Sequence, residues 1–138
     1  MRFEQSKSDN YTTIKLLDSK LDTRNAADLK GEFVVLNTEG VRYLILNLSE
    51  VSYADSSGLS SILVGNRLFK SNGGLLVLCA LSPFVEKLIK ISQLDSVLTI
   101  LPTEDEAREA VFMHTLENQI ESEEAAKTSD QEVPTSDN

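Results

Sequence analysis

The sequence contains few of the residues that build disulfides, metal sites and many catalytic centres. Its 138 residues include one cysteine, one histidine and no tryptophan. Because Cys79 is alone, no internal disulfide can form, and one cysteine with one histidine cannot make a zinc-ligand cluster. Hydrophobic residues make up 41% of the chain, an ordinary share for a protein with an apolar core. We therefore expect such a core, with no metal and no other cofactor.

An excess of positive charge and long apolar runs are also missing. Lysine and arginine number 13 against 22 aspartates and glutamates, which gives a net charge of −9. A direct nucleic-acid binder would need a basic face for the phosphates. No apolar run approaches the roughly 20 residues needed to cross a bilayer, and the first five residues lack the apolar stretch of a secretory signal. We predict a cytoplasmic protein that contacts neither nucleic acid nor a membrane.

The acidity is concentrated at the C-terminal end. Residues 117–138 hold seven acidic residues and one basic residue, which accounts for −6 of the net charge. Beyond Ile120 the only large apolar residue is Val133. Such a segment buries too little surface to offset its ordering entropy. We predict one globular domain over residues 1–116 and an acidic, largely disordered tail over residues 117–138.

Hydrophobic periodicity predicts strands and helices in alternation. Apolar residues recur at steps of three and four from Ala26 to Leu36, which is typical of a helix with one buried stripe. Nearly continuous apolar runs at 41–48 and 75–79 are typical of strands covered on both faces of a sheet. The predicted strands are 3–7, 11–16, 41–48, 75–79 and 97–101, and the predicted helices are 24–37, 57–70 and two that begin near Pro83 and Glu104.

This order of elements predicts the fold class. After an N-terminal hairpin, strands and helices alternate, which implies parallel strands joined by right-handed crossovers. We predict a single α/β domain with a mixed, mostly parallel sheet packed against about four helices. Ser82 and Pro83 have the character of an N-cap and a first helical residue. The helix that follows has an apolar stripe formed by Phe84, Val85, Leu88 and Ile89.

One segment, residues 51–59, combines the signals of a functional site. It leads from a predicted strand into a helix, and functional groups gather beyond the carboxyl ends of strands in open parallel sheets. Asp55, Ser56 and Ser57 stand at the predicted helix N-terminus, where backbone N–H groups and the helix dipole favour negative charge. A phosphorylated serine would be tolerated there, and Gly58 would let an external active site approach. The competing interpretation is a simple capping sequence, because Asp and Ser are common N-caps.

Enzymatic interpretations find little support. The only histidine, His114, lies near the tail, and no Gly-x-Ser-x-Gly motif of a serine hydrolase is present. Cys79 sits in an apolar run and is expected to be a buried small residue. Phosphate-binding glycine motifs are absent. Asp22 and Asp55 could converge as a carboxylate pair, although such residues are more often caps. We expect no catalytic activity.

Four blocks of sequence resemble one known family. They are Lys20–Thr23 with Asn25 and Ala26; Asn47–Leu59; Gly73–Cys79 with Leu81–Pro83 and Val85; and Leu94–Asp95 with Thr103–Ala107. In this order and spacing the chain, from Tyr11 to Ala110, resembles STAS-domain proteins, specifically bacterial anti-sigma-factor antagonists. The most specific block ends in Asp55-Ser56-Ser57-Gly58-Leu59.

The resemblance implies a phosphorylation switch. In such proteins the second serine of Asp-Ser-Ser-Gly is phosphorylated by an anti-sigma factor that is also a serine kinase, and here that serine is Ser57. The unmodified form binds the anti-sigma factor and frees the sigma factor, which regulates transcription indirectly, and a serine phosphatase resets the switch. The implied partner-binding surface comprises Asp22, Asp55, Ser56, Ser57, Gly58 and Leu59. The two aspartates are expected to make this surface acidic.

The chain departs from the family pattern at two places within the domain. Ser19 and Gln93 stand where glycine is common in the family, before Leu-Asp pairs. The change at Ser19 should affect a turn, and the change at Gln93 should affect a helix end.

Two alternative functions come from the wider family: a subunit of a larger signalling assembly, and a transport-accessory domain. The intact Asp55-Ser56-Ser57-Gly58 sequence favours the switch.

Overall fold

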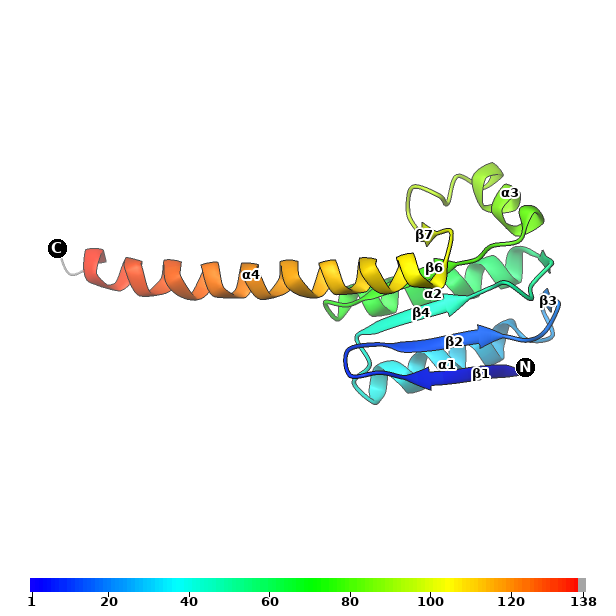
Figure 1. The fold of residues 1–138 in the computed structure, drawn as a ribbon, viewed down its shortest axis with the longest axis horizontal. Helices are drawn as coiled ribbons and strands as arrows, with labels where there is room; N and C mark the ends of the chain where they lie inside the picture. The colour runs from blue at the N-terminus through cyan, green and yellow to red at the C-terminus, as the bar shows by residue number, and fades with distance from the viewer. Residues whose placement is uncertain (137–138) are drawn as a thin grey trace.

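The computed structural model describes residues 1–136, with side chains through residue 125. Helices and strands alternate along most of this part of the chain, as Figure 1 shows. In chain order they are β1 (Phe3–Lys7), β2 (Thr12–Leu16), β3 (Lys20–Leu21), α1 (Ala26–Thr38), β4 (Tyr43–Asn47), β5 (Tyr53–Ala54), α2 (Ser56–Ser71), β6 (Leu75–Cys79), α3 (Pro83–Ile91), β7 (Thr99–Leu101) and α4 (Glu104–Ser136).

The main sheet has five strands in the order β1-β2-β4-β6-β7. β1 pairs with β2 in antiparallel fashion, whereas β2–β4, β4–β6 and β6–β7 are parallel pairs. The carboxyl ends of the parallel strands therefore meet at one edge, on the right in Figure 1. Together with the four helices, this arrangement confirms the predicted α/β fold with a mixed, mostly parallel sheet.

Residues of β4 alternate between two apolar layers. Leu44 and Leu46 join the larger layer, with buried residues of α1, α2 and α3. Tyr43 and Ile45 join the smaller layer, which includes Ala107 and Val111 of α4. Because successive side chains of a strand point to opposite faces, a continuous apolar run requires helices on both sides of the sheet. The predicted α1 stripe is confirmed, since its four residues are all buried: Ala26, Leu29, Phe33 and Leu36.

Two short strands were not predicted. β3 and β5 contain two residues each and form a separate parallel pair beside the main sheet. A strand of two residues is too short to show an alternating pattern, so sequence periodicity could not reveal it. The carbonyl of Ser19 accepts hydrogen bonds from the N–H groups of Ser52 (2.9 Å) and Tyr53 (3.2 Å), which anchors β5 to the chain before β3.

Gln93 closes α3 in a left-handed conformation, with φ of 60°. Its N–H donates to the Lys90 carbonyl, and the Leu94 N–H donates to the Ile89 carbonyl, each at 3.0 Å. This is a position where glycine avoids the steric penalty that a Cβ creates. The expectation that Gln93 lies at a helix end is confirmed. Ser19, the other departure from the family pattern, does not have a positive φ.

The last helix, α4, crosses the sheet and then projects beyond it (Figure 1). The predicted boundary between domain and tail, after residue 116, falls inside this helix. That division and the predicted disorder of the tail stay predictions. Residues 137–138 and the side chains from residue 126 onward lie outside the described part. Among the helices described, none combines the length and apolar character needed to span a membrane.

Candidate functional site

The small β3–β5 sheet brings two aspartates to neighbouring positions. Its register pairs Leu21 with Ala54, so Asp22 and Asp55 are the next residues along the two parallel strands. The Asp55 N–H donates to the Leu21 carbonyl at 3.2 Å. Parallel neighbours lie about 4.8 Å apart, so the main chains of the two aspartates leave this sheet side by side.

Asp55 is the N-cap of α2. Its Oδ1 accepts a hydrogen bond from the Gly58 N–H at 2.9 Å, and its carbonyl accepts one from the Leu59 N–H at 3.0 Å. Ser56 and Ser57 are therefore the first two helical residues. N–H groups at these positions have no partner within a helix. The capping interpretation thus holds for Asp55 and leaves both serine hydroxyls available, with Ser56 exposed and Ser57 half-buried.

Gly58 has a different role from the predicted one. The residue is buried, and a Cβ at this position would overlap the carbonyl oxygen and the side chain of Leu21. Glycine is thus required because β3 packs directly against the first turn of α2, not because an external active site must approach. Leu59 is only 6% exposed and belongs to the core. These two members of the predicted partner surface lie inside, whereas Ser56 is exposed and Asp22, Asp55 and Ser57 are half-buried.

Arg24 offsets the charge of Asp22. Its Nη2 lies 3.0 Å from Asp22 Oδ2, its Nε donates to Oδ1 at 3.3 Å, and its backbone N–H donates to Oδ1 at 3.0 Å. The hydrogen bonds and positive charge of Arg24 hold the pKa of Asp22 below its ordinary value. The surface beside α2 therefore carries less negative charge than was expected from Asp22 and Asp55 alone.

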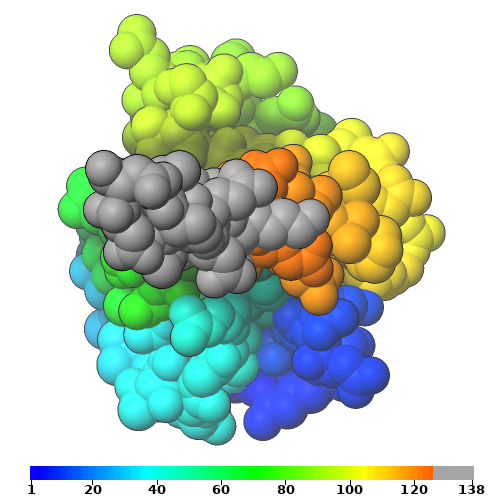
Figure 2. Space-filling view, turned by 90° about the vertical axis from the view of Figure 1, so that its left-hand side faces the viewer, coloured from blue at the N-terminus to red at the C-terminus, as the bar shows by residue number. Residues whose placement is uncertain are grey.

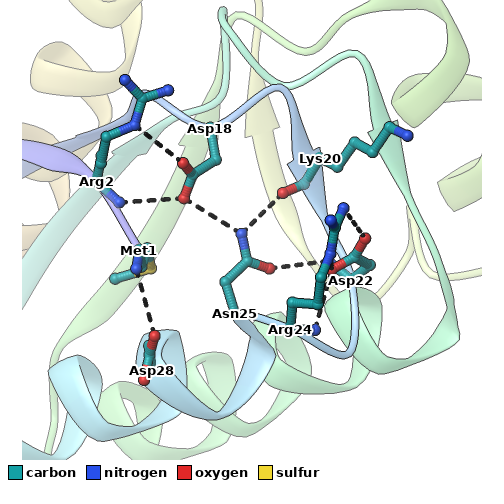
Figure 3. A network of polar contacts seen from close by, with 8 residues as sticks. All are labelled: Met1, Arg2, Asp18, Lys20, Asp22, Arg24, Asn25 and Asp28. Carbon is teal, nitrogen blue, oxygen red and sulfur yellow. Dashed lines mark hydrogen bonds and ion pairs between the residues drawn. The ribbon is translucent and has the colours of Figure 1, made fainter.

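Asn25 organises the loop that carries Asp22, as Figure 3 shows. Its Oδ1 accepts from the Asp22 N–H at 2.9 Å, and its Nδ2 donates to the Lys20 carbonyl at 2.8 Å and to Asp18 Oδ2 at 3.3 Å. The Arg2 N–H donates to the same Asp18 oxygen at 3.1 Å and is the main reason that the pKa of Asp18 is lowered. The N-terminus and this loop are thus tied together.

An exposed aromatic pair lies at the same edge of the fold. Tyr53 of β5 stacks on Phe84 of α3, with ring centroids 5.4 Å apart and planes at 27°. Phe84 is 48% exposed and Tyr53 is 40% exposed. Of the apolar stripe noted in the sequence of this helix, only Val85 and Ile89 are fully buried, whereas Phe84 lies at the surface. The sequence could have indicated this exposure, because the i, i+4 spacing of Val85 and Ile89 defines a buried face that leaves Phe84 at its margin.

The residues considered for catalysis lie elsewhere or are buried. The Nδ1 of His114 is 3.2 Å from the hydroxyl of Tyr43, which begins β4, so this histidine lies at the edge of the sheet opposite Ser57. Cys79 is fully buried, and burial raises the pKa of its thiol to about 11. Among the described residues, no group of three histidine, cysteine, aspartate or glutamate side chains could hold a metal ion. What the structure brings together at the edge that carries Ser57 is the exposed Ser56, the half-buried Ser57 and the Tyr53–Phe84 pair.

Comparison with known sequences identifies a family. The profile of a family described as STAS domain matches residues 5–107. BtrV of Bordetella bronchiseptica, which bears the name of an anti-sigma factor antagonist, is 29% identical over 97 residues. That match covers 70% of this chain and 84% of BtrV.

Solved structures give the same result. A Thermotoga maritima protein assigned as an anti-sigma factor antagonist is 28% identical, with a TM-score of 0.69 over 79% of this chain and 93% of that one. The Bacillus cell fate determinant SpoIIAA, solved in its phosphorylated form, is 25% identical, with a TM-score of 0.62. The match to SpoIIAA covers 80% of this chain and 99% of that protein.

Proposed function

The chain belongs to the STAS domain family, and from this membership we propose that it is an anti-sigma-factor antagonist switched by phosphorylation of Ser57. In its unmodified form it binds an anti-sigma factor and keeps that factor from its sigma factor. Phosphorylated Ser57 releases the anti-sigma factor, and transcription changes as a consequence. Two relatives bearing the antagonist name, together with a neighbour solved in a phosphorylated form, support this proposal.

The observation that carries the proposal is the position of Ser57 in α2. As the second residue of the helix, it stands where free backbone N–H groups and the helix dipole favour a negative group. A phosphate adds about −1.5 to −2 charges and three acceptor oxygens. Because the dipole favours such a charge by about 0.3–1 kcal/mol, the fold should tolerate the modification.

The switch acts through what surrounds Ser57. Ser56 is exposed beside it, and the stacked rings of Tyr53 and Phe84 supply apolar area at the same edge. A phosphate within this surface adds bulk and must lose water before a partner can dock. Since Arg24 already offsets the charge of Asp22, steric obstruction and desolvation contribute more to release than repulsion from an acidic surface.

The proposed partners divide the chemistry between them. The anti-sigma factor is a serine kinase that brings ATP, and the Ser57 oxygen attacks the γ-phosphorus while the bond to the ADP oxygen breaks. The hydroxyl proton leaves to a base of the kinase. A serine phosphatase then hydrolyses the phosphoester with water and restores the hydroxyl. This chain supplies the acceptor and the docking surface, performs no catalysis and needs no cofactor.

The test is to map the phosphate. The purified chain is incubated with ATP and an extract of its source cells, and the modified residue is identified by mass spectrometry. We expect phosphate on Ser57, loss of labelling in Ser57→Ala, and normal labelling in the matched control Ser56→Ala. Undiminished labelling of the Ser57→Ala protein would overturn the proposal.

A further inference from the structure

The helix α4 carries apolar residues on two opposite faces. One face packs on the sheet through Ala107 and Val111, and Asn118 on the same face donates to the Tyr43 hydroxyl at 2.9 Å. The other face carries Phe112 and Met113 together with Leu116 and Ile120. At 3.6 residues per turn, the centre of this second set lies roughly 180° around the helix from the sheet-facing residues.

The outer apolar residues form a continuous stripe on the solvent side, which we call the α4 stripe. Phe112, Met113 and Ile120 are 59%, 54% and 55% exposed, and Leu116 is half-buried between them. Their spacing of three, four and seven residues is the spacing of helix–helix contacts. Single exposed apolar residues are ordinary at a surface, but four on one helix face indicate an interaction site.

Charges beside the C-terminal half of the α4 stripe are all negative, whereas Arg108, one turn before Phe112, is paired with Glu104 and Asp105. Between residues 117 and 125 the chain has four carboxylates and no basic residue. All four side chains are exposed. Helical geometry places Glu117, Glu121 and Glu124 along one side of the stripe, and Glu123 in line with it, one turn beyond Ile120. A docked helix with lysine or arginine along one flank would therefore find complementary charge beside its apolar contacts and at their end.

We infer that the α4 stripe is a docking site for a basic amphipathic helix of a partner protein. The carboxylates of Glu117 to Glu124 disfavour a second copy of this chain, because pairing two such helices would bring like charges together. They also disfavour an anionic membrane surface, which attracts basic helices. This site goes beyond the proposed switch, since Asn118 reaches the Gly73 carbonyl in the turn before β6, at the edge of the sheet opposite Ser57.

Figure 2 shows the molecule from the end toward which α4 projects. The turns of α4 that are coloured yellow to orange form part of the outer surface there, next to the N-terminal hairpin in blue. Because Ser57 lies at the opposite edge of the sheet, a helix docked on the α4 stripe would leave that edge free. Both surfaces could be occupied at once.

Two synthetic peptides test the inference with the full-length chain. Both have about 20 residues, long enough to form a helix on binding, with leucine at helical i, i+3, i+4 and i+7 positions. One peptide has lysine and arginine at the flanking positions, and its twin has glutamate at those positions. We expect fluorescence anisotropy to show binding of the basic peptide that weakens with added salt, and at least about tenfold weaker binding of the acidic twin.

Variants of the full chain then locate the site. Met113→Ser combined with Ile120→Ser should weaken binding of the basic peptide at least about tenfold, whereas Ile91→Ser, at an even more exposed apolar position of α3, should not. Circular dichroism verifies that each variant keeps its helices. Equal binding of the two peptides, binding of neither, or unchanged binding by the stripe variant would overturn the inference. Sedimentation that shows a dimer dissociated by Ile120→Ser would also overturn it, because a second copy would then occupy the stripe.

Discussion

Leu21 and Gly58 are in direct main-chain contact, and this contact sets the position of Ser57. The Leu21 carbonyl accepts the Asp55 N–H at 3.2 Å, and the same oxygen occupies the space where a side chain on Gly58 would lie. The backbone of β3 is therefore held directly against the first turn of α2. The candidate phosphoacceptor Ser57 sits between Asp55 and Gly58, and both of these residues are fixed against Leu21.

Replacing Gly58 should disturb both fold and function. Gly58→Ala forces Leu21 and β3 away from α2, and overpacking of this kind costs about 1–3 kcal/mol. The matched control is Gly31→Ala, an exposed position of α1 with nothing within 4 Å of an added Cβ. That change should stabilise the chain by about 0.5–1 kcal/mol, because alanine is the better helix former. Urea unfolding measures both, and a Gly58→Ala protein as stable as the wild type would contradict the packing role.

The end of α3 offers a change that should stabilise the chain. At Gln93, with φ of 60°, a Cβ costs about 1–2 kcal/mol, and Gln93→Gly removes that strain. Part of the gain is offset by the greater freedom of glycine in the unfolded chain, so we expect a net increase of up to about 1 kcal/mol. Ser92→Gly, one residue earlier in an ordinary helical conformation, should instead destabilise the chain. Equal effects of the two substitutions on the unfolding midpoint would refute this reading.

Asp18 should contribute to the acid sensitivity of the fold. Its hydrogen bonds lower its pKa below the ordinary value of 3.8, so the ionised carboxylate stabilises the folded chain above that pH. As pH falls through the lowered pKa, both states become protonated and the contribution disappears. Asp18→Asn should therefore be less stable than the wild type near neutral pH, with the difference shrinking below about pH 4. A difference in unfolding free energy that is the same at every pH would be inconsistent with this expectation.

The aromatic pair should matter for binding more than for stability. Aromatic side chains at the centre of an interface often cost more than 2 kcal/mol on truncation, and each 1.4 kcal/mol is about tenfold in affinity. Phe84→Ala should thus weaken binding of the anti-sigma factor at least about tenfold while the melting temperature changes little. Ile91→Ala, at the other end of α3 and 69% exposed, is the matched control and should bind normally. Normal binding by the Phe84→Ala protein would show that the aromatic pair is not part of the interface.

The main elements and the location of the site were predictable because their signals are local. The four-residue stripe of α1, the apolar runs of β4 and β6, and the N-cap at Ser82 each appear within a few neighbouring residues. The Asp55-Ser56-Ser57-Gly58 sequence likewise marks a helix start. The helix was predicted to begin at Ser57. In the structure α2 begins one residue earlier, at Ser56, with Asp55 as its N-cap.

What could not be predicted depends on contacts between distant segments. The purpose of Gly58 becomes visible only when Leu21, 37 residues earlier in the sequence, is known to lie against it. The stack of Tyr53 on Phe84 joins a two-residue strand to a different helix. The charge offset at Asp22 depends on how Arg24 folds back over the same loop. Composition and periodicity carry no information on such pairings.

The most direct test of the switch is a binding titration of two forms of the full chain, unmodified and carrying phosphoserine at position 57, against the purified anti-sigma factor. Thermal melts of both forms are recorded in parallel. We predict that phosphoserine weakens binding by at least about a hundredfold, equivalent to about 2.8 kcal/mol, while the melting temperature stays nearly the same. Ser57→Ala should bind like the unmodified chain. If the phosphorylated form binds as tightly as the unmodified form, or loses binding only because it unfolds, the account of Ser57 as a surface switch is wrong.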